Sequence, residues 1–163
     1  MRNRPRLTRA RLRELLHYDR DTGEFRWLQR VGNELRPGSV AGCVEIRVQG
    51  RHYSAHQLAW FYMTGRWGRP MIDHRDGNST DNRWGNLRRA TSSQNNANRR
   101  RTPQNTSGYK GVSLVSNSRR RWRALIHKNR RMIHLGTFAT PQAAHAAYVA
   151  AARKLFGKFA RAK

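Results

Sequence analysis

Residues 73–78 read Asp73-His74-Arg75-Asp76-Gly77-Asn78, and this stretch decides both the local fold and the chemistry that we predict. The four residues Met71-Ile72-Asp73-His74 predict a short strand that follows a proline. Asp76-Gly77-Asn78 then predicts a turn, because Gly and Asn accept positive φ and Asp can bond back to its own backbone. The carboxylate and the imidazole therefore lie at the end of a strand, beside a tight loop.

The chain continues with a second strand and a helix. Residues 86–91 predict the strand, and the polar run after it predicts a helix whose N-cap we expect at Ser92 or Ser93. A strand–loop–strand–helix unit of this kind would bring Asp73 close to Asn95, although 22 positions separate them.

These side-chain types suit a single hard cation held beside a water molecule. A divalent ion such as Mg²⁺, or Mn²⁺ in its place, prefers oxygen ligands and keeps several of its own waters. One Asp carboxylate and one Asn carbonyl supply two oxygens and leave the other positions for water and phosphate. A histidine with an ordinary pKa of about 6.5 can take a proton from that water near neutral pH. The pattern predicts metal-assisted hydrolysis of a phosphodiester.

The order of residues Ile72-Asp73-His74-Arg75-Asp76-Gly77-Asn78, Asp81-Asn82-Arg83, Asn86-Leu87-Arg88 and Gln94-Asn95 resembles the HNH, or ββα-metal, motif of phage homing endonucleases. The resemblance implies that Asp73 and Asn95 hold one divalent cation in each active site. It implies that His74 is the general base. It also implies that Asn86 belongs to the catalytic set, where it ties the two strands together and orients the histidine.

The sequence leaves other interpretations open. Each matched residue, taken alone, is more often structural than functional. The chain could be a DNA-binding regulator that keeps an HNH remnant without activity. It could also be a nuclease that acts on RNA or without sequence preference, in defence or DNA packaging. His56 lies in a predicted helix before the motif, where a structural role is favoured over a catalytic one.

Charge points to a polyanion as the partner. The chain has 34 Lys and Arg against 9 Asp and Glu, a formal charge of +25 on 163 residues. Asp81 is the last acidic residue, so residues 82–163 carry 19 basic side chains and no carboxylate. A field of this strength drives association with nucleic acid, and binding through phosphate contacts weakens steeply as salt rises. We therefore expect double-stranded DNA as the partner and no membrane contact.

Composition sets further bounds. No stretch approaches 18–20 consecutive apolar residues, and the basic start of the chain precedes an amphipathic helix rather than a secretory apolar core. We expect neither a signal peptide nor a transmembrane segment, and a cytoplasmic location in a bacterial or phage-infected cell. Cys43 is the only cysteine, which excludes an internal disulfide and a zinc site of paired cysteines. We expect a monomer without a small-molecule cofactor.

The sequence divides into three parts. Residues 1–98 form an α+β region whose nuclease core is 69–98, and a hairpin is predicted within 44–53 by alternation around Gln49-Gly50. Residues 99–107 are polar, contain a proline and show no apolar periodicity, so they predict a basic linker. Residues 108–160 predict a second domain.

That second domain is expected to be a small three-stranded antiparallel sheet packed on one helix, so the fold class is α+β throughout. Strands are predicted within 109–115, 121–127 and 132–138. Thr140 is a helix N-cap followed by proline, and Gly157 is placed to end the helix. Side-chain alternation puts one set of residues under the helix, namely Trp122, Ala124, Ile126, Ile133 and Leu135. The opposite face carries Arg121, Arg123, Leu125, His127, Met132 and His134.

The segments Ser107-Gly108-Tyr109-Lys110-Gly111-Val112, Trp122-Arg123-Ala124 and Leu135-Gly136-Thr137-Phe138, with the alanine-rich helix after them, resemble the Apetala-two/ethylene-response-factor DNA-binding domain over about residues 107–160. The resemblance implies a sheet docked in the major groove, with Lys110 at a DNA-contacting position of the first strand. His127 and His134 occupy the places of an Arg and a Trp that touch DNA. Ser113 and Val115 stand where plant members have arginines, so the plant sequence preference is not expected.

We predict a strand-nicking, homing-type DNA endonuclease, since one such centre cuts one strand per encounter. The expected DNA-contacting residues come from the motif, the linker and the sheet: Arg88, Arg89, Arg99, Arg100, Arg101, Lys110, Arg121, Arg123, His127 and His134. For Arg88 and Arg89, contact with neighbouring phosphates and ordinary surface placement are equally expected.

Overall fold

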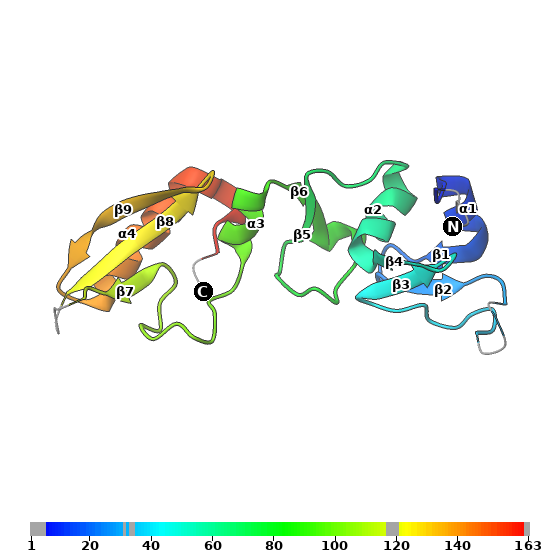
Figure 1. Cartoon of the computed structure of the whole chain (residues 1–163), viewed down its shortest axis with the longest axis horizontal. Helices are drawn as coiled ribbons and strands as arrows, with labels where there is room; N and C mark the ends of the chain where they lie inside the picture. The colour runs from blue at the N-terminus through cyan, green and yellow to red at the C-terminus, as the bar shows by residue number, and fades with distance from the viewer. Residues whose placement is uncertain (1–5, 31, 33–34, 117–120, 162–163) are drawn as a thin grey trace. The chain divides into compact units, whose positions relative to one another are not determined.

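The computed structural model describes residues 6–30, 32, 35–116 and 121–161, so residues 1–5 of the basic start lie outside it. The chain divides into two compact units, residues 1–89 and residues 90–163. Figure 1 shows the helices and strands of each unit, coloured along the chain from blue to red. Both units are α+β, with short antiparallel sheets and few helices, as the sequence predicts.

The first unit holds three small two-stranded sheets and two helices. Its described elements are α1 (Arg9–Leu15), β1 (Leu16–Tyr18), β2 (Phe25–Trp27), β3 (Glu45–Val48), β4 (Arg51–Ser54), α2 (Ala55–Thr64), β5 (Met71–His74), the 3-10 turn η1 (Trp84–Asn86) and β6 (Leu87–Ala90). The sheets are β1–β2, β3–β4 and β5–β6, and β6 ends at the first residue of the second unit. The hairpin predicted around Gln49-Gly50 is confirmed as β3–β4.

A single apolar core joins these sheets to the helices. Leu12 from α1, Phe25 from β2, Ile46 from β3 and Leu58 from α2 are almost completely buried. Ile72 brings β5 into the same core. The strand that carries Asp73 and His74 is therefore held against the rest of the unit by its apolar neighbour.

The second unit contains α3 (Ser92–Asn98), β7 (Val112–Leu114), β8 (Trp122–Lys128), β9 (Arg131–Phe138), α4 (Pro141–Phe156) and the 3-10 turn η2 (Gly157–Phe159). The predicted three-stranded antiparallel sheet on one helix is confirmed, with strand order β7-β8-β9 and α4 against it. Thr140 caps α4 by accepting a hydrogen bond from the Ala143 amide at 3.2 Å, and Gly157 ends the helix.

Side-chain alternation predicts correctly which residues of the central strand β8 face α4, but it does so only in part for the edge strand β9. Ala124 and Ile126 of β8 are buried under α4, and Arg123 and His127 are exposed. Ile133 lies directly opposite Ile126 but is 37% exposed, which corrects the expectation that it packs fully. The reason is that β9 is an edge strand and the helix covers the middle of the sheet. A register shift beside Ala124 adds a residue to β9 near Leu135.

The helix α3 begins one residue earlier than expected. Thr91, rather than Ser92 or Ser93, is the N-cap: its hydroxyl accepts from the Gln94 amide at 3.2 Å. The Gln94 side chain in turn accepts from the Thr91 amide at 2.8 Å, which completes a capping box. By its contacts α3 belongs to the second unit, where it packs on α4 and η2.

No described helix combines the length and the apolar character that spanning a bilayer requires.

Gly111 provides a test of the second unit's packing. Its φ is +73°, and a Cβ there would collide with the Tyr148 ring and lie 2.8 Å from the Leu125 carbonyl oxygen. Gly111→Ala should lower the unfolding free energy by about 3 kcal/mol or more, through backbone strain plus overpacking. Gly108 has a similar φ of +76° but open space around it, so Gly108→Ala should cost only about 1 kcal/mol. Urea unfolding measures both, and equal losses would contradict this packing.

Candidate active site and nucleic-acid interface

Asp73 and His74 are adjacent residues of β5, and both are buried. The two residues are 4% and 9% exposed, respectively. Burial of two ionisable groups at one strand end is costly unless each has partners. The chemistry open to Asp73 and His74 therefore depends on the groups that contact each of them.

Asp73 is held by an arginine from the neighbouring strand. Arg88 of β6 donates from Nε to Asp73 Oδ2 at 2.8 Å, and Arg88 is 7% exposed. In a pair this deeply buried, removing one partner leaves the other as an uncompensated charge. The prediction that Arg88 lies on the surface is therefore wrong, because its side chain is buried against the Asp73 carboxylate.

His74 is oriented by Asn82. The two are joined by a 3.2 Å contact between His74 Nε2 and Asn82 Oδ1. Asn82 donates from Nδ2 to the Cys43 carbonyl at 2.5 Å, and this contact fixes which end of the amide faces the histidine. An amide oxygen can only accept, so neutral His74 carries its proton on Nε2. Its Nδ1 then carries the lone pair that a general base needs.

The loop that carries Asn82 is supported by the β1–β2 hairpin. The Tyr18 hydroxyl donates to the Asn82 carbonyl at 2.6 Å, and burial raises the Tyr18 pKa so that this proton stays in place. Gly23, with φ +78°, lies so close that an added Cβ would be 2.5 Å from the Arg83 nitrogen. The N-terminal part of the chain thus holds the histidine's partner in position.

Asn82 is a site residue to which the sequence pattern assigns no role. It is 1% exposed, the most buried polar side chain of the described residues. The signal was present in Asp81-Asn82-Arg83, which belongs to the quoted motif. Sequence alone could not reveal that this amide, rather than a more exposed one, faces the imidazole.

Asn86 fixes the loop between β5 and β6. Its Nδ2 donates to Asp76 Oδ1 at 2.9 Å and to the Asp81 carbonyl at 2.8 Å, and its Oδ1 accepts from the Asp76 amide at 3.1 Å. Its backbone carbonyl accepts from the Arg75 amide at 2.8 Å. Asn86 therefore bonds to the residues just after His74, whereas Asn82 contacts the His74 ring itself.

His56 of α2 packs edge-on against the His74 ring, with centroids 5.1 Å apart. Burial, followed by the proximity of His74, lowers the pKa of His56 to about 4. His56 is consequently neutral at neutral pH and adds no second positive charge beside His74. This placement agrees with the favoured structural role.

Asn95 lies in the middle of α3, in the second unit, and is partly buried. The helix brings no carboxylate with it, since the last acidic residue of the chain is Asp81. The pairing of Asp73 with Asn95 around one cation remains a prediction from the motif.

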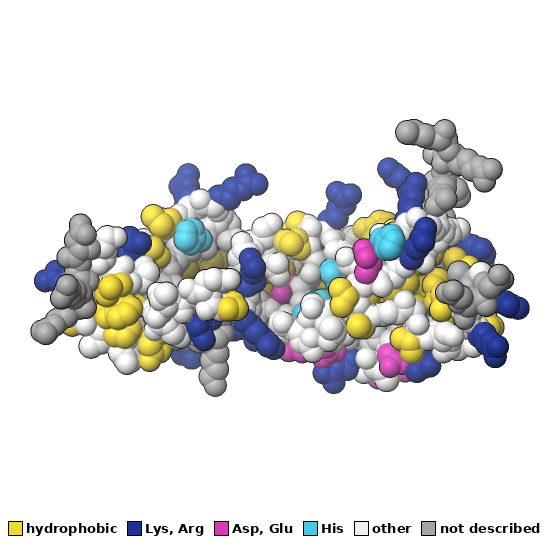
Figure 2. Space-filling view, turned by 60° about the horizontal axis from the view of Figure 1, so that its bottom comes forward, with side chains coloured by type: hydrophobic (Ala, Val, Ile, Leu, Met, Phe, Trp, Pro, Cys, Tyr) yellow, Lys and Arg dark blue, Asp and Glu magenta, His cyan; other side chains and the backbone are white. Residues whose placement is uncertain are grey.

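The basic residues of the linker and the motif are mostly exposed. Figure 2 shows Lys and Arg side chains along the surface of both units. Arg89 is exposed and donates to the Arg69 carbonyl from Nε at 3.0 Å and Nη2 at 2.7 Å. Arg99, Arg100 and Arg101 are exposed. Together with Lys110 they line a cavity of about 530 Å³ in the second unit.

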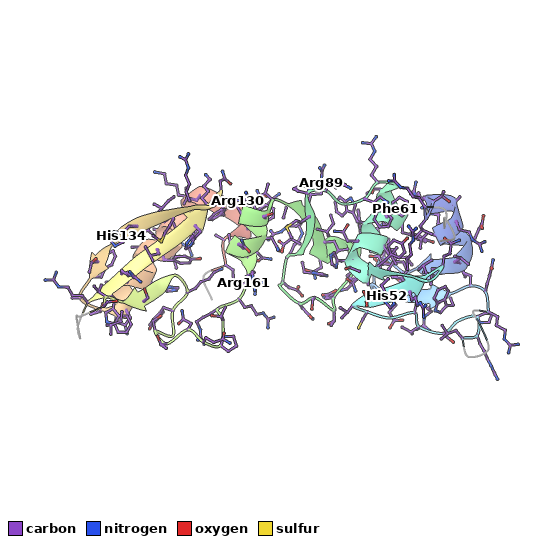
Figure 3. All side chains as sticks on the ribbon, viewed as in Figure 1. His52, Phe61, Arg89, Arg130, His134 and Arg161 are labelled. Carbon is purple, nitrogen blue, oxygen red and sulfur yellow. The ribbon has the colours of Figure 1, made fainter. Side chains whose placement is uncertain are left out.

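The sheet face turned away from α4 is the candidate DNA-reading surface. Arg121, Arg123, His127 and His134 are all exposed on the second unit, and His134 is labelled in Figure 3. Arg123 donates from Nε to the Ser113 hydroxyl at 2.9 Å, which steadies it on β8. Lys110 differs from this group, because its ammonium is directed to backbone carbonyls of its own unit.

The motif predicts a divalent-cation site with few protein ligands. Among the described residues no three His, Cys, Asp or Glu side chains gather as possible ligands. One carboxylate and one amide oxygen suit an ion that takes its remaining ligands from water and phosphate. A carboxylate can accept a guanidinium on one oxygen and bind a cation with the other, so the Arg88 contact is compatible with Asp73 as a ligand.

The comparison with known families agrees with this arrangement. Residues 53–97 match the family model described as HNH endonuclease, a range that begins in β4 and ends within α3. This range, called the HNH domain from here on, is therefore similar to HNH endonucleases. The HNH domain contains the pair Asp73 and His74, the two structural amides Asn82 and Asn86, and Asn95. No curated protein and no solved structure matches the chain.

Asn82→Ala should test the role of this amide in the HNH domain. The substitution removes the partner of His74 Nε2 and of the Cys43 carbonyl, so the unfolding free energy should fall by roughly 3 kcal/mol. The exposed Asn78→Ala should cost less than about 1 kcal/mol. In ¹⁵N spectra, wild-type His74 should be the Nε2–H tautomer near pH 8, and the variant should lose that preference. An unchanged tautomer would show that Asn82 does not orient the ring.

Proposed function

We propose that the protein is a divalent-metal-dependent DNA endonuclease that hydrolyses one phosphodiester per encounter and leaves a nick. The observation that carries the proposal is the orientation of His74. A buried imidazole beside a carboxylate, with Nε2 bound to an amide oxygen, has its basic nitrogen fixed in one direction. An inactive remnant would not need so many buried contacts to hold one ring.

Asp73 and Asn95 would hold Mg²⁺, or Mn²⁺ in its place. Bound there, the cation would polarise the phosphate and stabilise charge on the departing 3′ oxygen. Arg88 would hold the Asp73 carboxylate in one direction through its Nε hydrogen bond to Oδ2. Only by exchanging that carboxylate for a phosphate would Arg88 itself contact DNA.

His74 would remove a proton from the attacking water through Nδ1. Asn82 supports this step twice, since it blocks Nε2 as the base and accepts more strongly as the imidazolium forms. Neutral His56 beside the ring avoids a like charge that would oppose protonation of His74. Asn86 keeps the loop after His74 in one conformation.

DNA would be held by the basic face of the second unit and by the linker. Arg99, Arg100, Arg101 and Arg89 are exposed and suited to phosphate contacts, which position the duplex without reading it. The exposed side chains of β8 and β9 offer base contacts in the major groove, in the manner that the Apetala-two resemblance implies. A homing role, with one or a few fixed cut sites, is part of this proposal.

His74→Ala should reduce plasmid nicking in Mg²⁺ by about 10³-fold, because a general base contributes roughly 10²–10⁴-fold. DNA affinity in EDTA should be unchanged. The matched control is His17→Ala, which removes an exposed histidine of β1 in the same unit and should retain full activity.

Three other outcomes would contradict the proposal in distinct ways. A wild-type protein that binds DNA tightly but leaves plasmid intact in Mg²⁺ would be a regulator. Full activity of His74→Ala would remove the proposed base. Dispersed cuts on long DNA would support a non-specific nuclease in defence or packaging, and would remove only the homing role.

A further inference from the structure

The helix that carries Asn95 is too short to be stable by itself. α3 has 7 residues, and isolated helices shorter than about 12 residues are marginal in water. Its stability must come from what it packs against. Ala97 and Asn98, which lie two and three residues after Asn95, are buried in the second unit, with Ala97 in the same apolar cluster as Phe156 and Phe159.

The first turn of α3 is fixed by the β8–β9 hairpin. Asn129 and Arg130 form the turn with φ values of 51° and 65°. The Asn129 amide donates to the Ser93 hydroxyl at 3.0 Å. The turn therefore contacts the first turn of α3, whose N-terminus is also stabilised by the Thr91–Gln94 capping box.

The last turn of α3 is fixed by Lys110. Its ammonium donates to the Ala97 carbonyl at 2.6 Å and to the Arg99 carbonyl at 2.7 Å, and a 3.4 Å contact reaches the Arg161 carbonyl. A cation at a helix C-terminus satisfies carbonyls that have no partner within the helix and complements the helix dipole. Burial, with Arg161 and Arg99 nearby, lowers the pKa of Lys110 to about 8, so the ammonium form with three donors prevails at pH 7.

Arg161, which follows η2, also bonds to the last turn of α3. Its amide donates to the Ala97 carbonyl at 3.3 Å and its Nε to Asn98 Oδ1 at 3.4 Å. Arg161 is labelled in Figure 3. Lys110 and Arg161 thus hold consecutive residues of the helix from two different segments.

We propose that Lys110 and Arg161 are positioning residues of the nuclease, which fix α3 and through it the Asn95 amide that serves the metal. The inference rests on the proposed function. Under it, α3 carries the Asn95 ligand, and side chains of the same unit hold that helix. Lys110, expected from sequence to touch DNA, has a structural partner instead, so its loss affects metal use rather than DNA affinity.

Lys110→Met should test this in three measurements on the full-length protein. Amide exchange of residues 95–99 without metal should speed up about tenfold, because carbonyl bonds to a charged donor are lost. The Mg²⁺ concentration that gives half-maximal nicking should rise several-fold, and the nicking rate at saturating Mg²⁺ should change less. DNA affinity in EDTA should stay within about twofold, since no phosphate contact is removed.

The matched control is Lys154→Met, which removes one exposed charge from α4 and should change none of the three. Arg161→Met is the second variant, should Lys110→Met fail to fold, and should show the same pattern more weakly. Unchanged exchange of residues 95–99 in both variants would overturn the inference. So would weaker DNA binding with normal exchange, because this result identifies Lys110 as a phosphate contact. The exchange measurement needs no activity, so it decides the inference even if wild-type protein proves unable to nick DNA.

Discussion

The buried Asn82 side chain makes the contact on which the proposed chemistry of the first unit depends. Asn82 links the His74 imidazole on β5 to the backbone carbonyl of Cys43, and its backbone carbonyl accepts from the Tyr18 hydroxyl. A two-stranded sheet as small as β5–β6 could not fix a histidine by packing alone. The β1–β2 hairpin and the loop before β3 hold the partner of the histidine by hydrogen bonds to Asn82.

A second constraint concerns charge. Asp73 is the only acidic residue among the buried residues described, and Arg88 forms a salt bridge with it. Every other Asp and Glu lies in the first unit, so the second unit has no acidic side chain that would repel a polyanion. In the proposed enzyme, the first unit carries His74 and Asp73, and the second unit makes most of the DNA contacts. The matched range 53–97 extends past the boundary between the units, so α3 belongs to the motif and to the second unit.

The sequence predicted what depends on spacing and periodicity. The motif, the three-stranded sheet, the Thr140 cap and the hairpin at Gln49-Gly50 follow from local rules, and the structure confirms the elements. It could not predict which of several polar residues turns inward. Asn82 rather than Asn86 faces the imidazole, Arg88 is buried against Asp73, and Lys110 reaches carbonyls of α3, because long side chains choose partners that only tertiary packing provides. The misplaced cap at Ser92 or Ser93 has a local cause, since Thr91 and Gln94 form a better reciprocal pair.

The most direct measurement is a crystal structure of the full-length protein with Mn²⁺ and a DNA duplex that it cannot cleave, with the metal located by anomalous scattering. The account predicts one strong peak, with an Asp73 carboxylate oxygen and the Asn95 amide oxygen both at coordination distance and His74 Nδ1 facing a water beside the phosphate. A peak bound elsewhere, or Asp73 and Asn95 in separate environments while DNA fills the site, would contradict it.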